Sequence, residues 1–313
     1  MDSRYQAASE RMQGPLAPIM TPFDERDALD ERSLAASVDW MAERGVPVLW
    51  TTGGTSEMAS LTEAEIFDLA RIVTEASRGR IFTIVSTGPT WPASKCVEFV
   101  RFAESCGADA VKLHIPWQGR PSDAGVLEFY GRIADATDLP LLAYTLGQPG
   151  MSVELLLQII DRFPQFVGIK NDTDDQYLHS VYLAAVPSGF RVITGGMQRP
   201  FLTGYRFGQR CYTDVFTRFK PQVAMQLYDL VRSARVDEAV AHIKRYEMRL
   251  SDLWIYGGRG GFDTKATGKT ISWLVGQFAT NRVRFPLQTQ APDGPQVAAI
   301  RKLLEEFEVE VVR

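Results

Sequence analysis

The feature that most constrains the fold is an eightfold alternation of short apolar runs with longer amphipathic stretches. The runs are rich in β-branched residues and begin at intervals of 20 to 34 residues. Each interval accommodates one strand and one crossover helix, as in a parallel βαβ unit. We expect strands to begin near Leu16, Val46, Arg80, Asp109, Pro140, Phe166, Arg191 and Cys211.

The intervening stretches have the periodicity of helices. Between Val153 and Ile160, apolar residues fall at i, i+3, i+4 and i+7, which is one face of an α-helix. Ser152 precedes this stretch where an N-cap belongs. Thr62 and Glu65 have the spacing of a capping box at the start of another helix.

Eight strand–helix units predict a (β/α)8 TIM barrel with a C-terminal helical extension. The rival fold, a doubly wound open sheet, needs a glycine-rich first turn, and the first unit instead reads MTPFDERD. We expect a polar N-terminal arm over residues 1–14, a barrel over 15–234 and an extension over 235–313 packed on the barrel. Further helices are expected at 221–234, 236–253, 265–280 and 295–309.

Composition and charge exclude several classes of protein. With 34 Lys and Arg against 38 Asp and Glu, the net charge is -4, so nothing favours nucleic acid or an anionic membrane as a partner. No apolar stretch approaches the ~18 residues of a membrane span. Three cysteines without a CxxC pattern argue against a disulfide framework. A reducing, cytoplasmic location is therefore expected.

Barrel active sites lie at the C-terminal ends of the strands, and Lys170 occupies such an end in the run FVGIK. Burial disfavours the ammonium form and lowers the pKa of a lysine. The neutral amine is the nucleophile that forms a Schiff base with a ketone. The alternative is a lysine that extends from a strand end to solvent.

Tyr144 ends the preceding strand, in LLAYT, at a height where it can approach Lys170. A phenol in that place can relay protons during imine formation. The alternative is a half-buried core tyrosine with its hydroxyl at the surface. Gly195 ends the seventh predicted strand on the same side of the barrel.

The loop after the second predicted strand combines glycines with hydroxyl residues, at Gly53, Gly54, Thr55 and Ser56. Backbone N–H groups in such a loop can bind a carboxylate or a phosphate. A tight turn that needs glycine for its geometry alone is the alternative.

Candidate metal and phosphate motifs are weak. Asp172, Asp174 and Asp175 lack calcium-loop spacing and suit a helix start. The segment 268–270 (Gly-Lys-Thr) follows no strand and lacks the first glycine of a phosphate loop. His114 ends a predicted strand, and we expect a structural role for it. No metal is therefore expected.

Together these motifs resemble the dihydrodipicolinate synthase / N-acetylneuraminate lyase family of class I lyases. The resemblance extends from about Gly14 to Arg284 and depends on PIMTPFD, GGTSE followed by SLT, Tyr144, VGIK ending in Lys170, and VITGG. Within the family, PVLWTTGGTSEMASL, ITGGM and YTDVFTRFKP look most similar to the 5-dehydro-4-deoxyglucarate dehydratase branch.

The resemblance implies roles for individual residues. Lys170 would form the Schiff base, Tyr144 would relay protons, and the Gly54–Thr55 part of the loop would bind the carboxylate of a 2-keto acid. The covalent imine between lysine and substrate would make a separate cofactor unnecessary. The resemblance also implies a homo-oligomer, either a dimer or a tetramer. Arg218 and Arg259 are candidates to bind a distal carboxylate.

Departures from the family pattern leave the substrate open. Ser56 replaces the family's loop glycine, and Thr145 replaces the asparagine of the dehydratase branch. Residues 145–150 lack the arginine of dihydrodipicolinate synthases, and Trp117-Gln118 replaces an aromatic pair. A sugar-acid aldolase, a condensation enzyme and a non-catalytic keto-acid-binding barrel stay as alternatives. A metal-dependent aldolase lacks a ligand set.

Overall fold

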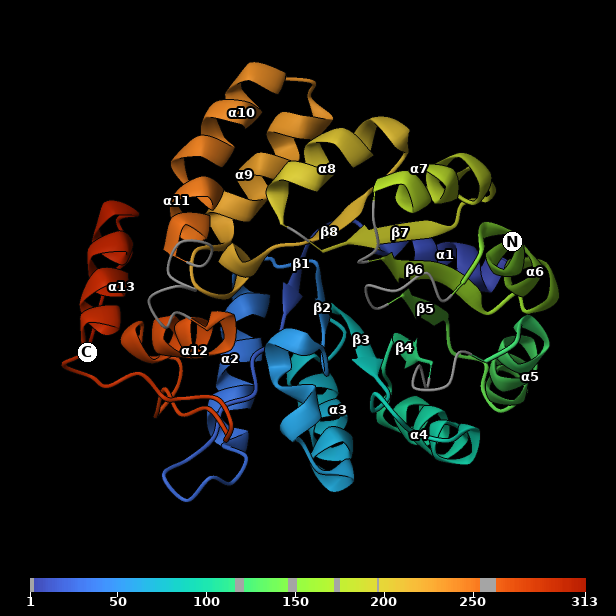
Figure 1. The fold of residues 1–313 in the computed structure, drawn as a ribbon, viewed down its shortest axis with the longest axis horizontal. Coiled ribbons are helices and arrows are strands. Elements are labelled where there is room, and N and C mark those ends of the chain that lie inside the picture. The colour runs from blue at the N-terminus through green and yellow to red at the C-terminus, as the bar shows by residue number, and fades with distance from the viewer. Residues whose placement is uncertain (1–2, 116–120, 146–150, 172–174, 196, 254–262) are drawn as a thin grey trace.

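The protein folds as a closed barrel of eight parallel strands with helices between successive strands, which confirms the predicted fold class (Figure 1). The computed structural model describes residues 3–115, 121–145, 151–171, 175–195 and 197–253, and 263–313. Each strand pairs with its sequence neighbours, and β1 pairs with β8 to close the barrel. The strands are β1 (Gly14–Pro18), β2 (Val48–Trp50), β3 (Phe82–Ser86), β4 (Ala110–His114), β5 (Leu141–Thr145), β6 (Phe166–Asn171), β7 (Arg191–Thr194) and β8 (Cys211–Thr213).

The helices begin where the sequence carries capping residues. At the start of α3, Thr62 and Glu65 form the predicted capping box, and Ser152 caps α6 through the backbone N–H of Leu155. Both expectations are confirmed. The barrel helices are α2 (Glu31–Glu43), α3 (Glu63–Ser77), α4 (Ala93–Cys106), α5 (Asp123–Ala134), α6 (Val153–Arg162), α7 (Asp175–Ala184), α8 (Gln198–Gly204) and α9 (Pro221–Arg232).

Helix α1 (Ser3–Arg11) occupies the segment expected to be a polar arm. Its apolar residues Tyr5 and Ala8, with Met12 just beyond, recur at i, i+3 and i+7 and are buried in the same cluster as the barrel interior. The helix therefore packs on the barrel instead of fraying, because three apolar side chains share one of its faces.

The C-terminal helices also differ from expectation in their bounds. The stretch 236–253 divides into α10 (Val236–Arg245) and α11 (Glu247–Ser251), which meet at Tyr246. Helix α12 (Thr264–Leu274) ends before Gly276, whose positive φ of 78° suits a chain reversal. Helix α13 (Pro295–Glu306) completes the extension.

Buried apolar residues from this extension join a cluster beside the barrel. Ile300 and Leu304 of α13 pack in the same cluster as Phe216 and Phe219, which follow β8. The extension is thereby held against the C-terminal side of the last strand. Figure 1 shows α11, α12 and α13 gathered on one side of the barrel.

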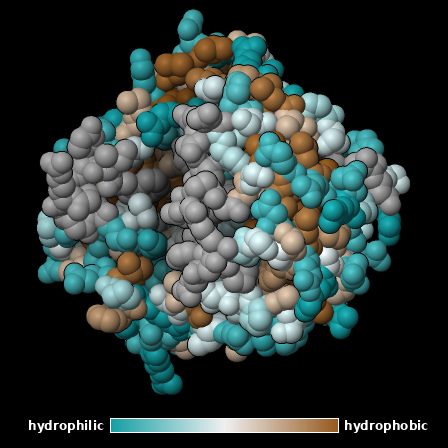
Figure 2. All heavy atoms as spheres, turned by 45° about the vertical axis from the view of Figure 1, so that its right-hand side comes forward, coloured by the Kyte–Doolittle hydropathy of each residue, from teal (hydrophilic) through white to brown (hydrophobic). Residues whose placement is uncertain are grey.

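The outer surface is that of an ordinary packed barrel. Figure 2 shows hydrophilic residues over much of the coloured surface, with smaller hydrophobic patches between them. Among the described residues, no helix combines the length and the apolarity needed to cross a membrane.

Candidate active site

A cavity of about 380 Å³ lies at the C-terminal ends of the strands. Strand ends and the segments that follow them supply most of its walls, as expected for a (β/α)8 barrel. Of the predicted site residues, the cavity lining includes Lys170, Tyr144, Gly53, Gly54, Thr55, Gly195 and Arg218. Gly53 and Arg218, which are 165 positions apart in the sequence, therefore meet in one space.

Tyr144 and Lys170 lie directly opposite each other in the parallel register of β5 and β6. Both are buried, with 8% of Tyr144 and 4% of Lys170 exposed. The Lys170 Nζ atom lies 5.6 Å from the centre of the Tyr144 ring and 5.5 Å from that of Trp50. Lys170 is therefore withdrawn from solvent, close to two aromatic rings, and still lines the cavity.

Lys112 is a second buried lysine in this cavity, and the sequence reasoning did not single it out. It lies in the middle of β4, two residues before His114, so both point to the same face of the strand. Ala110, two residues earlier, belongs to the buried cluster inside the barrel. The sequence signal for Lys112 is a lysine on the inward-facing side of a buried strand. A search restricted to strand ends does not find it.

His114 packs beside the catalytic candidates. Its ring contacts that of Tyr144 edge to face, with centres 4.9 Å apart. Burial, and then the charge of Lys112, holds the pKa of His114 well below its usual value. Its backbone N–H donates to the Thr87 hydroxyl. His114 is thus a neutral imidazole beside the Tyr144 ring.

The loop after β2 forms a short 3₁₀ turn, η1 (Gly54–Ser56). Within this turn, the backbone N–H groups of Ser56 and Glu57 donate to the carbonyl oxygens of Gly53 and Gly54. The N–H groups of Gly54 and Thr55 take no part in the internal hydrogen bonds of the turn. The Ser56 hydroxyl donates to the Ile19 carbonyl oxygen and accepts from the Gly53 N–H. Ser56 therefore ties the loop to the segment after β1, while its neighbours line the cavity.

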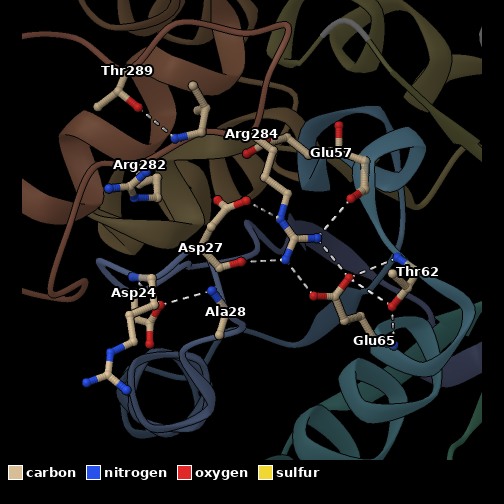
Figure 3. Close-up of polar contacts among 12 residues, drawn as sticks. Asp24, Asp27, Ala28, Glu57, Thr62, Glu65, Arg282, Arg284 and Thr289 are labelled. Carbon is tan, nitrogen blue, oxygen red and sulfur yellow. Dashed lines mark hydrogen bonds and ion pairs between the residues drawn. The ribbon is translucent and has the colours of Figure 1, made fainter.

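Glu57 ends this loop in the left-handed region, with φ of 57°, and is fully enclosed. Its carboxylate forms a buried ion pair with Lys269 of α12, and also accepts from the backbone N–H of Arg284. The Arg284 guanidinium in turn binds Glu65 and the Asp27 carbonyl oxygen (Figure 3). The C-terminal extension thus fixes the position of the loop.

Arg218, in the 3₁₀ turn η6 (Val215–Arg218) after β8, also lines the cavity and is 6% exposed. Burial lowers its pKa to about 10. No described residue accepts a hydrogen bond from its buried Nη1 atom. Nearby Asp214 accepts from Gln198 and from the backbone N–H of Phe216, and burial raises its pKa to about 7.

A second arginine on this side is already paired. Arg199 forms an ion pair at 2.6 Å with Glu247, whose side chain is 1% exposed. Glu247 also accepts from the backbone N–H groups of Gln198 and Arg199. Burial raises the pKa of Glu247, and its bond to Arg199 opposes that rise. Arg199 and Glu247 were not among the sequence candidates, because they become neighbours only in the folded chain.

Some sequence candidates lie outside the described residues. These include Arg259, the pair Trp117-Gln118, the segment 146–150, and Asp172 and Asp174. Within the described part of the chain, no group of three or more His, Cys, Asp or Glu side chains is arranged to bind a metal ion.

The fold and the cavity define a (β/α)8 barrel whose candidate site, with a buried lysine and tyrosine, occupies the face used by barrel enzymes. The Dihydrodipicolinate synthetase family model matches residues 11–295. The chain belongs to this family, whose members are class I lyases or aldolases.

Curated relatives are similar in sequence, and a solved structure shares the fold. The chain is 29% identical over 232 residues to a 4-hydroxy-tetrahydrodipicolinate synthase of Anaplasma marginale, covering 73% of this chain and 76% of the relative. It is 27% identical over 285 residues to the synthase of Parabacteroides distasonis, covering 90% and 92%. The dihydrodipicolinate synthase structure from Oceanobacillus iheyensis superposes with a TM-score of 0.82 at 22% identity, covering 97% and 99%.

Proposed function

We propose that the chain is a Schiff-base-forming lyase that acts on a sugar-derived 2-keto acid, and that it dehydrates and decarboxylates 5-dehydro-4-deoxyglucarate. The observation that carries the proposal is the pairing of Tyr144 with Lys170 in a buried cavity at the C-terminal face of the barrel. An amine removed from water is favoured in its neutral, nucleophilic form.

Substrate binding begins at the loop after β2. The backbone N–H groups of Gly54 and Thr55 receive the carboxylate next to the keto group. The Lys170 amine attacks the keto carbon and forms a carbinolamine. Tyr144 passes a proton to the departing hydroxyl group, so that water leaves and an iminium remains.

The iminium is an electron sink that acidifies the adjacent C–H bond. Loss of that proton gives an enamine, which expels a β-hydroxyl group as water. The distal carboxylate then leaves as carbon dioxide, and its electron pair passes into the conjugated iminium, which takes up a proton. The resulting enol becomes the aldehyde, and hydrolysis of the imine releases 2,5-dioxopentanoate and restores Lys170. The lysine supplies the electron sink, so the scheme needs no separate cofactor or metal.

A second cationic group in the cavity lining supports a substrate with a second carboxylate. Arg218 is buried there, and a guanidinium binds a carboxylate through two parallel hydrogen bonds. Arg199 lines the same wall, already bonded to Glu247. The loop after β2 and Arg218 together provide two places for carboxylates, which suits a dicarboxylate better than pyruvate alone.

A condensation reaction is the second candidate, favoured by the names of the curated relatives. A 2-keto-3-deoxy sugar acid aldolase shares the same enamine, which in that case arises by carbon–carbon cleavage. Residues 145–150 lack the arginine expected of a dihydrodipicolinate synthase, and this departure is why we place dehydration first.

We further infer a cytoplasmic homo-oligomer, a dimer or tetramer. The location is supported by three free cysteines, Cys96, Cys106 and Cys211, of which Cys96 and Cys211 are buried. Family membership supports the assembly. Light scattering on the purified protein measures the oligomeric state directly.

Borohydride trapping with peptide mass spectrometry tests the proposal. The protein is incubated with pyruvate or with 5-dehydro-4-deoxyglucarate, reduced, digested and mapped. We expect a reduced adduct on Lys170 with both ligands, and release of carbon dioxide only with the second. An adduct without carbon dioxide release points to the aldolase or the condensation enzyme. No adduct with any of a broad panel of keto acids contradicts the Schiff-base assignment.

A further inference from the structure

Lys112 is enclosed inside the barrel, where a charged side chain is costly unless its surroundings favour it. Only 1% of the residue is exposed. In register it lies opposite Ser86 of β3 and Leu142 of β5, and neither carries a charge. A lysine at this inward position therefore calls for a physical reason.

The groups around Lys112 favour its ammonium form. Its Nζ atom lies 4.4 Å from the centre of the Trp50 ring and 4.7 Å from that of Tyr144. The faces of aromatic rings attract cations, most strongly where water is excluded. The same Nζ donates to the Thr52 carbonyl oxygen at 3.4 Å, at the start of the carboxylate-binding loop. These contacts offset part of the cost of burying the charge.

Lys112 and Lys170 share the same two rings. The Nζ atom of Lys170 also lies near the centres of Trp50 and Tyr144, at 5.5 and 5.6 Å. Of the two, Lys112 is nearer to both rings, so its ammonium form gains more from them than that of Lys170 does. Two ammonium groups in one enclosed space repel each other, so the less stabilised one gives up its proton first.

We propose that Lys112 is a positioning residue that stays protonated and thereby keeps the amine of Lys170 neutral, ready to attack the keto group. A nearby cation is one of the general ways to activate an amine nucleophile. This inference depends on the proposed Schiff-base function of Lys170. It assigns the two lysines different roles: Lys112 carries the positive charge, and Lys170 forms the covalent imine with the substrate.

The other titratable groups that face the cavity are consistent with a charged Lys112 and a neutral Lys170. His114 is neutral, because burial and then Lys112 depress its pKa. Arg199 and Glu247 form an ion pair with each other, and Arg218 lies after β8. Tyr144 is the phenol whose ring lies near both lysines, and it is the group expected to move protons. Lys112 is the cation that shares both rings with Lys170.

The test compares the pH dependence of imine trapping in wild type and in Lys112 variants. Pyruvate serves as the probe, and the adduct is quantified by mass after borohydride reduction between pH 5 and 10. Lys112→Met removes the charge and preserves an unbranched chain, whereas Lys112→Arg retains the charge. Lys112→Gln is a second neutral variant in case the methionine variant does not fold. Circular dichroism verifies folding.

We expect the adduct on Lys170 in all folded variants. The midpoint of trapping should shift upward by about one pH unit or more in the neutral variants and stay near wild type in Lys112→Arg. Trapping at pH 7 should then fall about tenfold and recover at high pH.

Coincident midpoints in wild type and the neutral variants overturn the inference and leave the Schiff-base function standing. An adduct on Lys112 in the wild type reverses the two roles and also overturns it. If wild type forms no adduct at any pH with pyruvate, 5-dehydro-4-deoxyglucarate or any other member of a broad panel of keto acids, the proposed function fails and the inference fails with it.

Discussion

Tyr144 and Lys170 occupy directly paired positions on β5 and β6, so their side chains emerge at the same height inside the barrel. Parallel strands place residues in equivalent register about 4.8 Å apart. The pair is therefore positioned by backbone hydrogen bonds, which are harder to distort than side-chain contacts. Rigid placement of this kind is what a nucleophile and its proton relay require.

Replacing Lys170 with alanine should abolish both borohydride trapping and turnover. No other group on β6 can supply the amine, so we expect a loss of at least about a thousandfold in kcat. Far-UV circular dichroism should match wild type. Turnover within about tenfold of wild type in a folded Lys170→Ala protein would contradict the assignment.

Replacing Tyr144 with phenylalanine removes the hydroxyl and retains the ring beside Lys112 and Lys170. Imine formation should slow by about a hundredfold or more, the usual contribution of a positioned proton donor. The dissociation constant for a keto acid should change little. Stopped-flow measurement of adduct formation separates the two quantities, and an unchanged rate would argue against the relay.

Arg218 should distinguish substrates by their distal charge. In Arg218→Met, KM for 5-dehydro-4-deoxyglucarate should rise by about ten- to a hundredfold, because one charge-assisted contact is lost. Trapping by pyruvate, which has no second carboxylate, should persist. Steady-state kinetics and trapping on the same preparation make the comparison, and equal losses with both ligands would indicate a structural role instead.

Asp214 should make stability depend on pH. Burial raises its pKa to about 7, against about 4 in an unfolded chain. The folded state holds this proton more tightly, so the contribution is fully present below about pH 4 and is lost as pH rises through about 7.

Replacing Asp214 with asparagine should remove that dependence. The Gln198 side-chain oxygen has no described hydrogen-bond partner, so this amide can rotate to accept from the new asparagine. Melting temperatures of wild type and Asp214→Asn, measured from pH 4 to 8, should diverge by a few degrees across this window. Parallel curves would show that Asp214 titrates normally in the folded protein.

Lys269 should contribute to stability through Glu57. Lys269→Met leaves the Glu57 carboxylate buried without its ammonium, which costs about 3–5 kcal/mol in comparable cases. Arg232→Met is the matched control, because its pair with Asp229 is more than half exposed and should contribute less than about 1 kcal/mol. Urea unfolding measures both, and similar losses would contradict the buried-pair argument.

The barrel could be predicted from the sequence because its signals are local and repeated. Eight β-branched runs at regular intervals, with capping residues such as Thr62 and Ser152 before the helices, specify strand and helix order without any long-range information. The same pattern made Lys170 and Tyr144 candidates, because a strand end in a barrel is a defined place, and the family resemblance implied their roles. The family motifs supported this assignment independently.

Tertiary structure alone decided which distant residues share the cavity and the loop. Lys112 lies mid-strand and becomes notable only when its neighbours Trp50 and Tyr144 are seen around it. Glu57 meets Lys269 across more than two hundred residues of chain. Such contacts follow from barrel closure and helix packing, and burial then sets the charge of each group. Local sequence patterns carry no information about these long-range contacts or about the charge states of the buried groups.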